Sequence, residues 1–151
     1  ALIFDIQDIG SRYYTYVSTL TNIMSACAEI DLPLYVLDRP NPIGGEYIDG
    51  PILNLEYSSF VGMHPIPIRH GMTIGELAFM INELGWSGEE KTNLKIIAMQ
   101  GWNRNMYFES TGKKWAILDC LETSKGDLET PMQILNYKPE KGDLGGLVTS
   151  I

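Results

Sequence analysis

Basic residues, cysteines and long apolar runs are all scarce in this 151-residue sequence, and each scarcity argues against a class of function. There are 11 Lys and Arg against 19 Asp and Glu, which gives a net charge of −8. This balance argues against a nucleic-acid partner, because phosphate binding needs clustered cations. No apolar run approaches the ~20 residues of a membrane-spanning helix. Two cysteines do not make a disulfide framework.

What is present is the composition of a globular protein, with 44% hydrophobic residues and a length that fits one domain. The sequence begins on the apolar segment 1–6, without Met and without a basic leader. We interpret residue 1 as a truncation point and expect the domain to be incomplete at both ends. The compartment therefore stays open, and an extracytoplasmic or periplasmic location is expected if the full-length protein carries a signal peptide.

Apolar periodicity predicts alternating strands and helices. Strands are expected at residues 1–6, 34–37 and 94–99, with helices from an N-cap at Ser11 to about Ile30 and from a capping box at Thr73 to about Leu84. Tyr13 falls on the predicted buried face of the first helix. A further short helix is expected near residues 129–136. Strands joined by helical crossovers pair in parallel, so the fold class is α/β with a mainly parallel sheet.

The segment 39–72 is rich in Pro and Gly and is far longer than an ordinary connection of about 4–6 residues. A connection of this length is usually either functional or disordered. Its aromatic and apolar residues favour an ordered conformation.

Polar residues follow both of the first two predicted strands. In open α/β sheets ligands bind beyond the carboxyl ends of the strands, so these side chains are candidate site residues. Carboxylates in such a place could act as general acids or bases. In the alternative interpretation the aspartates cap turns and pair with the arginines. The candidates are Asp5, Gln7, Asp8 and Arg12 after the first strand, and Asp38, Arg39 and Asn41 after the second.

Two further features suit an anionic ligand and a carbohydrate, respectively. Arg69 and His70 directly precede a helix N-terminus, where cationic donors and free N–H groups favour a carboxylate, and His70 could carry a proton. Trp102 and Arg104 offer an aromatic face and hydrogen-bond donors that fit carbohydrate. Equally, His70 could be an ordinary loop residue and Trp102 a buried one.

No cofactor is expected. His64, His70 and Glu76 do not have a spacing typical of zinc sites, so we predict no metal.

Three motifs together resemble a known family. They are FDIQDIGSRYYTY at residues 4–16, LDRPNPIGG at 37–45 and PIPIRHGMTIGEL at 65–77, with a weaker match in GWNR at 101–104. The sequence is similar here to the bacterial exo-β-N-acetylmuramidases, formerly classed as a domain of unknown function. The resemblance implies that residues 1–115 are part of a Rossmann-like catalytic domain with helices flanking an open sheet. Residues 116–151 depart from the family pattern and form a divergent tail.

The resemblance implies a glycoside hydrolase that releases N-acetylmuramic acid from the non-reducing ends of peptidoglycan fragments, as in cell wall recycling. Asp8 and Asp38 would be catalytic, with Arg12 and Arg39 orienting them. Arg69 and His70 would contact the lactyl carboxylate of the sugar. The further substrate-binding candidates are Asp5, Gln7, Asn41, Trp102 and Arg104.

The family has a C-terminal domain and an upstream Glu-His-Gly motif that this sequence lacks. A non-catalytic carbohydrate-binding remnant and an inactive truncated product are therefore the alternatives to a muropeptide-cleaving glycosidase.

Overall fold

The computed structural model describes residues 1–112, 117–118 and 146–147. The chain divides into two units, Ala1–Lys113 and Lys114–Ile151. In the second unit β4 (Ile117–Leu118) pairs in antiparallel fashion with β5 (Gly146–Leu147). The helix predicted near 129–136 lies outside the described residues.

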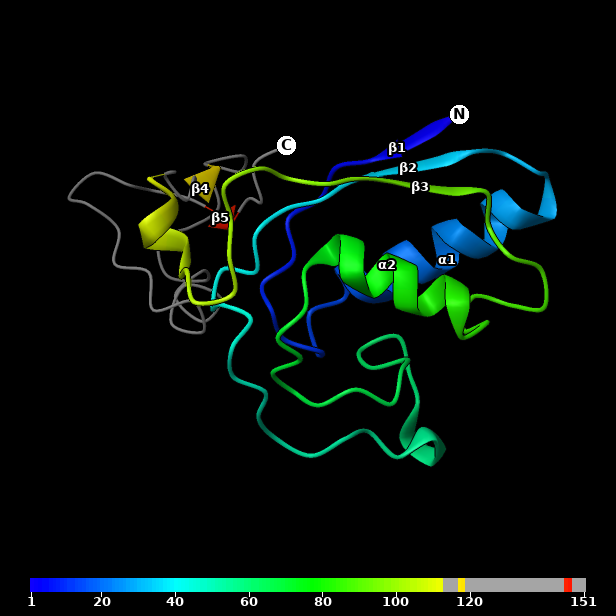
Figure 1. The fold of residues 1–151 in the computed structure, drawn as a ribbon. Helices are drawn as coiled ribbons and strands as arrows, with labels where there is room; N and C mark the ends of the chain where they lie inside the picture. Colours follow the sequence, from blue (N-terminus) through cyan, green and yellow to red (C-terminus); the bar gives the residue numbers. More distant parts are fainter. Residues whose placement is uncertain (113–116, 119–145, 148–151) are drawn as a thin grey trace. The chain divides into compact units, whose positions relative to one another are not determined.

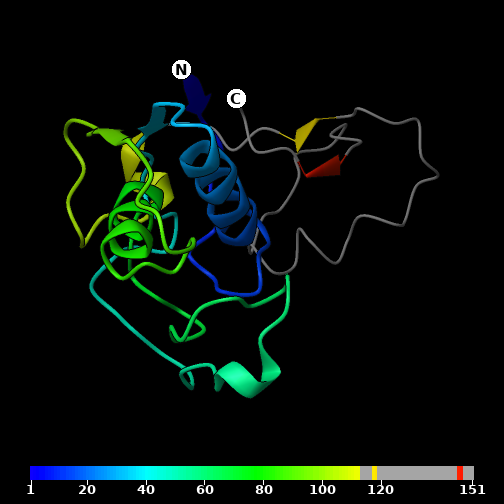
Figure 2. The same ribbon diagram turned by 90° about the vertical axis from the view of Figure 1, so that its right-hand side faces the viewer.

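The first unit is built on a three-stranded parallel sheet. Its strands are β1 (Leu2–Phe4), β2 (Leu34–Leu37) and β3 (Leu94–Ile97), in the order β1-β2-β3. Two helices, α1 (Tyr16–Glu29) and α2 (Ile74–Glu83), lie on the same side of this sheet (Figures 1 and 2). The α/β class and the parallel, Rossmann-like arrangement predicted from the sequence are therefore confirmed.

The core lies between the sheet and the two helices. Phe4 and Leu34 from the strands, Leu20 from α1, and Leu77 and Ile81 from α2 are each no more than 2% exposed. Burying such side chains contributes about 1.5–3 kcal/mol each. The outer strands are shorter than predicted, since β1 ends at Phe4 and β3 at Ile97.

The first helix begins later than the sequence indicates. The expected N-cap was Ser11, but α1 begins after Thr15, whose side chain makes no capping hydrogen bond. Ser11 instead forms an antiparallel bridge with Arg69, and the Arg12 amide donates to the Ile68 carbonyl at 2.8 Å. Because of this long-range pairing, the helix does not begin at the capping signal of Ser11. Tyr13, expected on a buried helix face, is 44% exposed.

The second helix begins where the capping box predicts. The Thr73 hydroxyl accepts from the Glu76 amide at 3.2 Å, and the Glu76 carboxylate accepts from the Thr73 amide at 3.0 Å. The two bonds satisfy backbone donors that a helix N-terminus otherwise leaves free.

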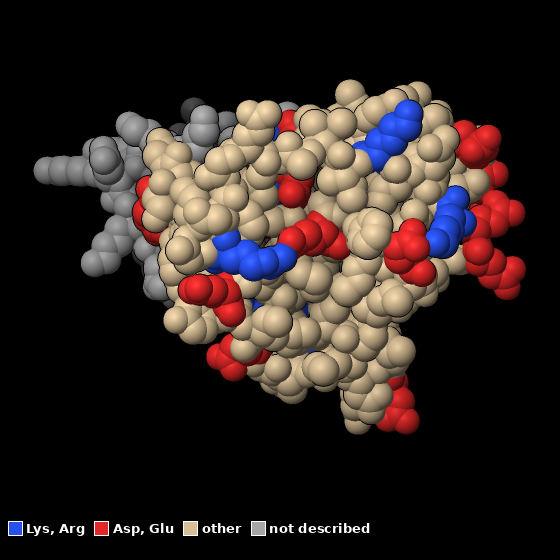
Figure 3. Space-filling view, in the orientation of Figure 1, with Lys and Arg blue, Asp and Glu red and all other residues tan. Residues whose placement is uncertain are grey.

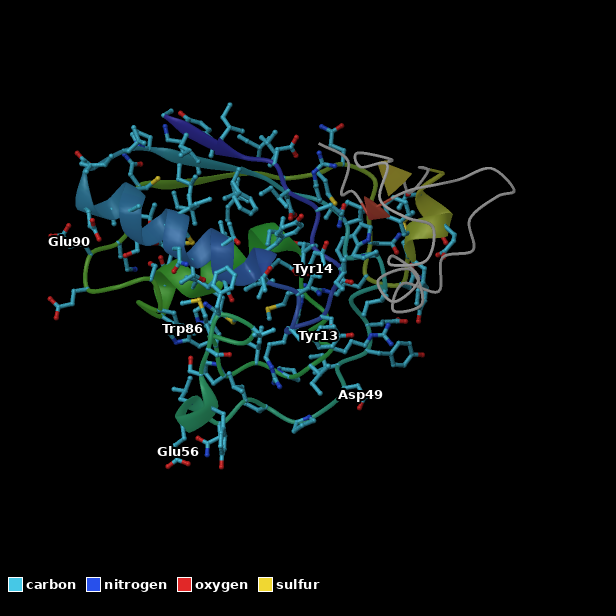
Figure 4. The ribbon with its side chains drawn as sticks, turned by 180° about the vertical axis from the view of Figure 1, so that it is seen from behind. Tyr13, Tyr14, Asp49, Glu56, Trp86 and Glu90 are labelled. Carbon is cyan, nitrogen blue, oxygen red and sulfur yellow. The ribbon has the colours of Figure 1, made fainter. Side chains whose placement is uncertain are left out.

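The long connection between β2 and α2 is ordered and contains a short 3-10 helix, Leu55–Tyr57. His64 holds this connection against the helices, because its ring forms a hydrogen bond with Thr21 of α1 at 2.7 Å and stacks on Trp86. Figure 4 shows Trp86 on the side of the helices that faces the loop carrying Glu56. Among the described residues, no helix is both long and apolar enough to cross a membrane.

Candidate functional site

The segments that follow β1 and β2 are bound to each other by side chains. Arg39 Nε donates to Asp5 Oδ1 at 2.6 Å, and Gln7 Nε2 donates to the Pro40 carbonyl at 2.8 Å. The Asp5 and Arg39 side chains are 28% and 24% exposed. The structure therefore brings together these residues at the carboxyl edge of the sheet, as the strand-end argument predicts.

Asn41 connects this edge to the segment that leads into α2. Its Nδ2 donates to the Met72 carbonyl at 2.9 Å, and its Oδ1 accepts from the Ile43 amide at 3.1 Å. Asn41 is only 2% exposed. Gly10, at φ +81°, packs so close that a Cβ there would lie 2.3 Å from Asn41 Oδ1. The asparagine therefore fixes the loops that surround the site.

Asp8 and His70 face each other in the interior. His70 Nδ1 accepts from the Met72 amide at 3.2 Å, so Nε2 is the ring nitrogen that carries a proton. Nε2 is 3.3 Å from Asp8 Oδ2, but the alignment falls short of a hydrogen bond. Asp8 Oδ2 accepts from the Gly10 amide at 2.8 Å, while its buried Oδ1 has no partner among the described residues. Both side chains are buried, which suits positioning better than contact with a ligand.

Asp38 binds the N-terminus of α2. Its Oδ1 accepts from the Gly75 amide at 2.8 Å and the Arg39 amide at 3.0 Å, and its Oδ2 accepts from the Thr73 hydroxyl at 3.1 Å. Burial raises the pKa of Asp38, although these three hydrogen bonds act in the opposite direction. Glu76 is a further, weaker cause that raises the same pKa.

The two arginines do not orient Asp8 and Asp38, so that expectation is wrong. Arg39 pairs with Asp5, as the alternative interpretation proposed. Arg12 Nη1 donates to the carbonyls of Pro51 and Ile66 in the long connection. The Arg12 side chain lies beside these carbonyls because the backbone of residues 11–12 pairs with that of residues 68–69.

Residues after β3 return to the start of α2. Arg104 Nη2 forms an ion pair with Glu76, and Nη1 donates to the Gly71 carbonyl at 2.9 Å. The Gly45 amide donates to the Arg104 carbonyl at 2.7 Å. Trp102 is half-buried, and its Nε1 has no hydrogen-bond partner within the described part of the chain. Arg104 thus borders the same strand-end site.

Arg69 lies between two tyrosines that sequence reasoning missed. Its Cζ is 5.6 Å from the ring centroid of Tyr47 and 6.0 Å from that of Tyr107. Its Nη2 donates to the Ile43 carbonyl and lies 3.5 Å from the Tyr107 hydroxyl. The positions of these three residues in the sequence follow no regular spacing that would predict their contact. The only sequence feature that could have marked Tyr47 as a site residue is its place in a Gly-rich loop.

Figure 3 shows scattered Lys and Arg side chains on the face of the molecule seen in Figure 1, with acidic side chains close to some of them. The described residues contain no group of three or more His, Cys, Asp or Glu that could hold a metal ion. The site therefore offers carboxylates, guanidiniums and aromatic rings as its chemical groups.

Comparison with known proteins gives consistent matches. The profile of the family described as exo-beta-N-acetylmuramidase NamZ, N-terminal, matches residues 1–118. The peptidoglycan beta-N-acetylmuramidase NamZ of Bacillus subtilis (strain 168) is 51% identical over 110 residues, which are 73% of this chain and 26% of that protein.

Two crystal structures of DUF1343 family proteins from Bacteroides fragilis NCTC 9343 have a similar fold. The match to one of them has a TM-score of 0.72 and 44% sequence identity, and it covers 76% of this chain and 30% of the Bacteroides fragilis chain. The match to the other has a TM-score of 0.65 and 46% sequence identity, and it covers 70% of this chain and 30% of the second Bacteroides fragilis chain. The chain therefore spans less than a third of the length of these relatives. By sequence and by fold, this chain belongs to the family of NamZ exo-β-N-acetylmuramidase N-terminal domains.

Proposed function

We propose that this chain is part of a glycoside hydrolase that acts on peptidoglycan-derived sugars and releases N-acetylmuramic acid from their non-reducing ends. The observation that carries this proposal is the family match over residues 1–118, which contains every residue of the strand-end site. The identity to the Bacillus subtilis enzyme favours a hydrolase over a non-catalytic binding remnant.

Asp38 is the proposed catalytic acid. Glycoside hydrolysis uses a pair of carboxyl groups, one of which must be protonated to donate to the leaving oxygen. A raised pKa keeps Asp38 protonated to a higher pH than an exposed aspartate. The side chain is half-buried and lies at the carboxyl end of β2, where ligands of open α/β sheets bind.

The second carboxyl group is proposed to be Asp5 or Glu76. Their side chains are 28% and 38% exposed, and each forms an ion pair with an arginine. Asp8 is proposed to position the site through Gly10 and His70, because it is buried behind the surface.

The substrate is proposed to bind across the same edge. Gln7, Arg39 and Asn41 shape the loops, while Trp102 offers a ring beside Arg104. Arg69 is proposed to contact the lactyl carboxylate, which N-acetylglucosamine lacks. His70, 1% exposed, is proposed to support Arg69 from the interior instead of reaching the sugar.

The test is binding and turnover of muramic acid derivatives by the chain. Saturation-transfer NMR should show N-acetylmuramic acid binding more tightly than N-acetylglucosamine. A chromogenic N-acetyl-β-muramide serves for turnover, with Asp38→Asn as the variant. Glu83→Gln is the matched control, because Glu83 forms an exposed ion pair with Lys91 at the far end of α2.

Turnover that Asp38→Asn abolishes and Glu83→Gln leaves intact would support the catalytic assignment. Binding without turnover would support the sugar specificity and would place the missing catalytic group in sequence beyond this chain. Equal affinity for the two sugars, or no affinity for either, would refute the proposed function.

A further inference from the structure

Large apolar side chains are exposed together on one part of the connection between β2 and α2. Their exposed fractions lie between 51% and 75%. They surround the short 3-10 helix of this connection and are Ile52, Leu55, Tyr57, Phe60 and Val61. Figures 1 and 2 show the connection projecting on the side of the two helices that faces away from the sheet. We call residues 52–61 the apolar arm.

The backbone of the arm is held in a defined conformation although its apolar side chains face solvent. The Asn54 side chain caps the 3-10 helix, because its Oδ1 accepts from the Glu56 amide at 3.2 Å. Ser59 and Gly62 exchange two backbone hydrogen bonds, at 3.0 and 2.9 Å. A scaffold that is already ordered lowers the entropic cost of binding. The arm is therefore built to present its side chains to a partner.

Charge is nearly absent from this part of the chain. Glu56 is the only Asp, Glu, Lys or Arg between residues 50 and 68, and its carboxylate accepts from Asn54 Nδ2 at 2.9 Å. Figure 3 shows few charged side chains on the corresponding lower projection, whereas the rest of that face carries both acidic and basic groups. Covering charged groups with an apolar partner would strip them of water at a cost. On a second copy of this chain, the surface that matches the arm best is therefore the same arm.

The exposed apolar area is close to what a weak dimer needs. Aromatic side chains offer about 150–250 Å² each and branched aliphatic ones somewhat less, so the five together present on the order of 500–600 Å². Apolar patches of this size on a monomer are often functional. Two arms in contact would bury on the order of 1,000–1,200 Å², which is about the lower limit of specific interfaces. A dissociation constant of roughly 10–100 µM is expected for such a contact.

We propose that the apolar arm is a self-association surface through which two copies of the chain pair about a two-fold axis. Each arm packs against its counterpart, so the apolar side chains of both copies leave water. A contact of this symmetry closes at two copies, because both arms are then occupied. The arm contains none of the residues of the strand-end site, so the inference does not depend on the proposed function.

Sedimentation equilibrium of the 151-residue chain, from about 5 to 500 µM, tests the pairing. The average mass should rise with concentration from 16.9 kDa towards twice that value and then level off. Each copy carries a net charge of −8, so the two copies repel each other. Raising the salt from about 20 to 300 mM should therefore strengthen the dimer, because salt screens the repulsion.

Phe60 variants test whether one arm contacts another. Phe60→Glu and Phe60→Lys should each raise the dissociation constant at least about tenfold, because like charges would meet across the two-fold axis. An equimolar mixture of the two variants should recover the dimer. Phe79→Glu is the matched control, because Phe79 is 59% exposed on α2 and lies outside the arm. Leu55→Gln replaces them if a Phe60 variant is unfolded by circular dichroism.

Several results would overturn the proposal. They are a monomer at every concentration, growth of the average mass beyond the dimer, and a Phe79→Glu variant that weakens association as much as Phe60→Glu. A mixture of the two Phe60 variants that stays monomeric would exclude the contact of one arm with another. A monomer that sediments with phosphatidylcholine vesicles, and loses this binding in Phe60→Glu, would assign the arm to a lipid surface instead.

Discussion

Lowering the pH from 7 to 4.5 should destabilise the folded chain through His64. The ring is 4% exposed and stacks on Trp86, with its centroid 4.9 Å from that of the indole. Its Nε2 is 2.7 Å from the Thr21 hydroxyl, which itself donates to the Val17 carbonyl at 3.0 Å. Thr21 is therefore the acceptor, and the neutral His64 ring carries its proton on Nε2.

Burial lowers the pKa of His64 from 6.5 to about 4. Between these values the unfolded chain binds a proton that the folded chain does not, so the free energy of unfolding falls as the pH falls. At roughly 1.4 kcal/mol per pH unit, the full effect is about 3 kcal/mol. About 2.5 kcal/mol of it should appear between pH 7 and pH 4.5.

Urea unfolding at the two pH values measures this effect, and His64→Gln provides the reference. The variant lacks the titrating group and keeps the other ionisable residues, so the difference between its pH dependence and that of the wild type isolates His64. An NMR titration of the His64 ring tests the cause directly. A pKa near 6.5, or an equal loss of stability in wild type and His64→Gln, would refute the reasoning.

Two further predictions concern the start of α2. Thr73→Ala should lower the free energy of unfolding by about 1–2 kcal/mol, because it removes the N-cap and the hydroxyl that bonds to Asp38. Thr73→Ser should recover most of this loss in urea unfolding, and a serine variant as unstable as the alanine variant would count against the cap. Gly75→Ala should destabilise the chain by about 1–3 kcal/mol despite the better helix propensity of alanine, because the new Cβ would lie 2.7 Å from Asp38 Cγ and 2.9 Å from Ile96 Cγ2. A thermal melt of Gly75→Ala at or above that of the wild type would show that the packing against Asp38 is looser than the structure indicates.

Local signals in the sequence determined the elements that depend on neighbouring residues. The capping box of Thr73 and Glu76 specifies where α2 begins, because both of its hydrogen bonds are made within one turn. The convergence of Asp5, Gln7 and Arg39 was also predictable. Parallel neighbouring strands end at the same edge of a sheet, so the residues that follow them must meet there.

Only the tertiary structure decided the partners of Ser11 and Arg12. Ser11 gave a helix-capping signal, yet pairing with Arg69, far along the chain, delays α1 to Tyr16. The same pairing places the Arg12 side chain beside the carbonyls of Pro51 and Ile66, so it binds these instead of Asp8.

The enclosure of Arg69 by Tyr47 and Tyr107 likewise could not be predicted from residue spacing. The three residues come together only when the long connection and the segment after β3 fold against the same edge of the sheet. Hydrogen bonds within one helical turn can be predicted from spacing, whereas contacts between distant loops depend on the path of the whole chain.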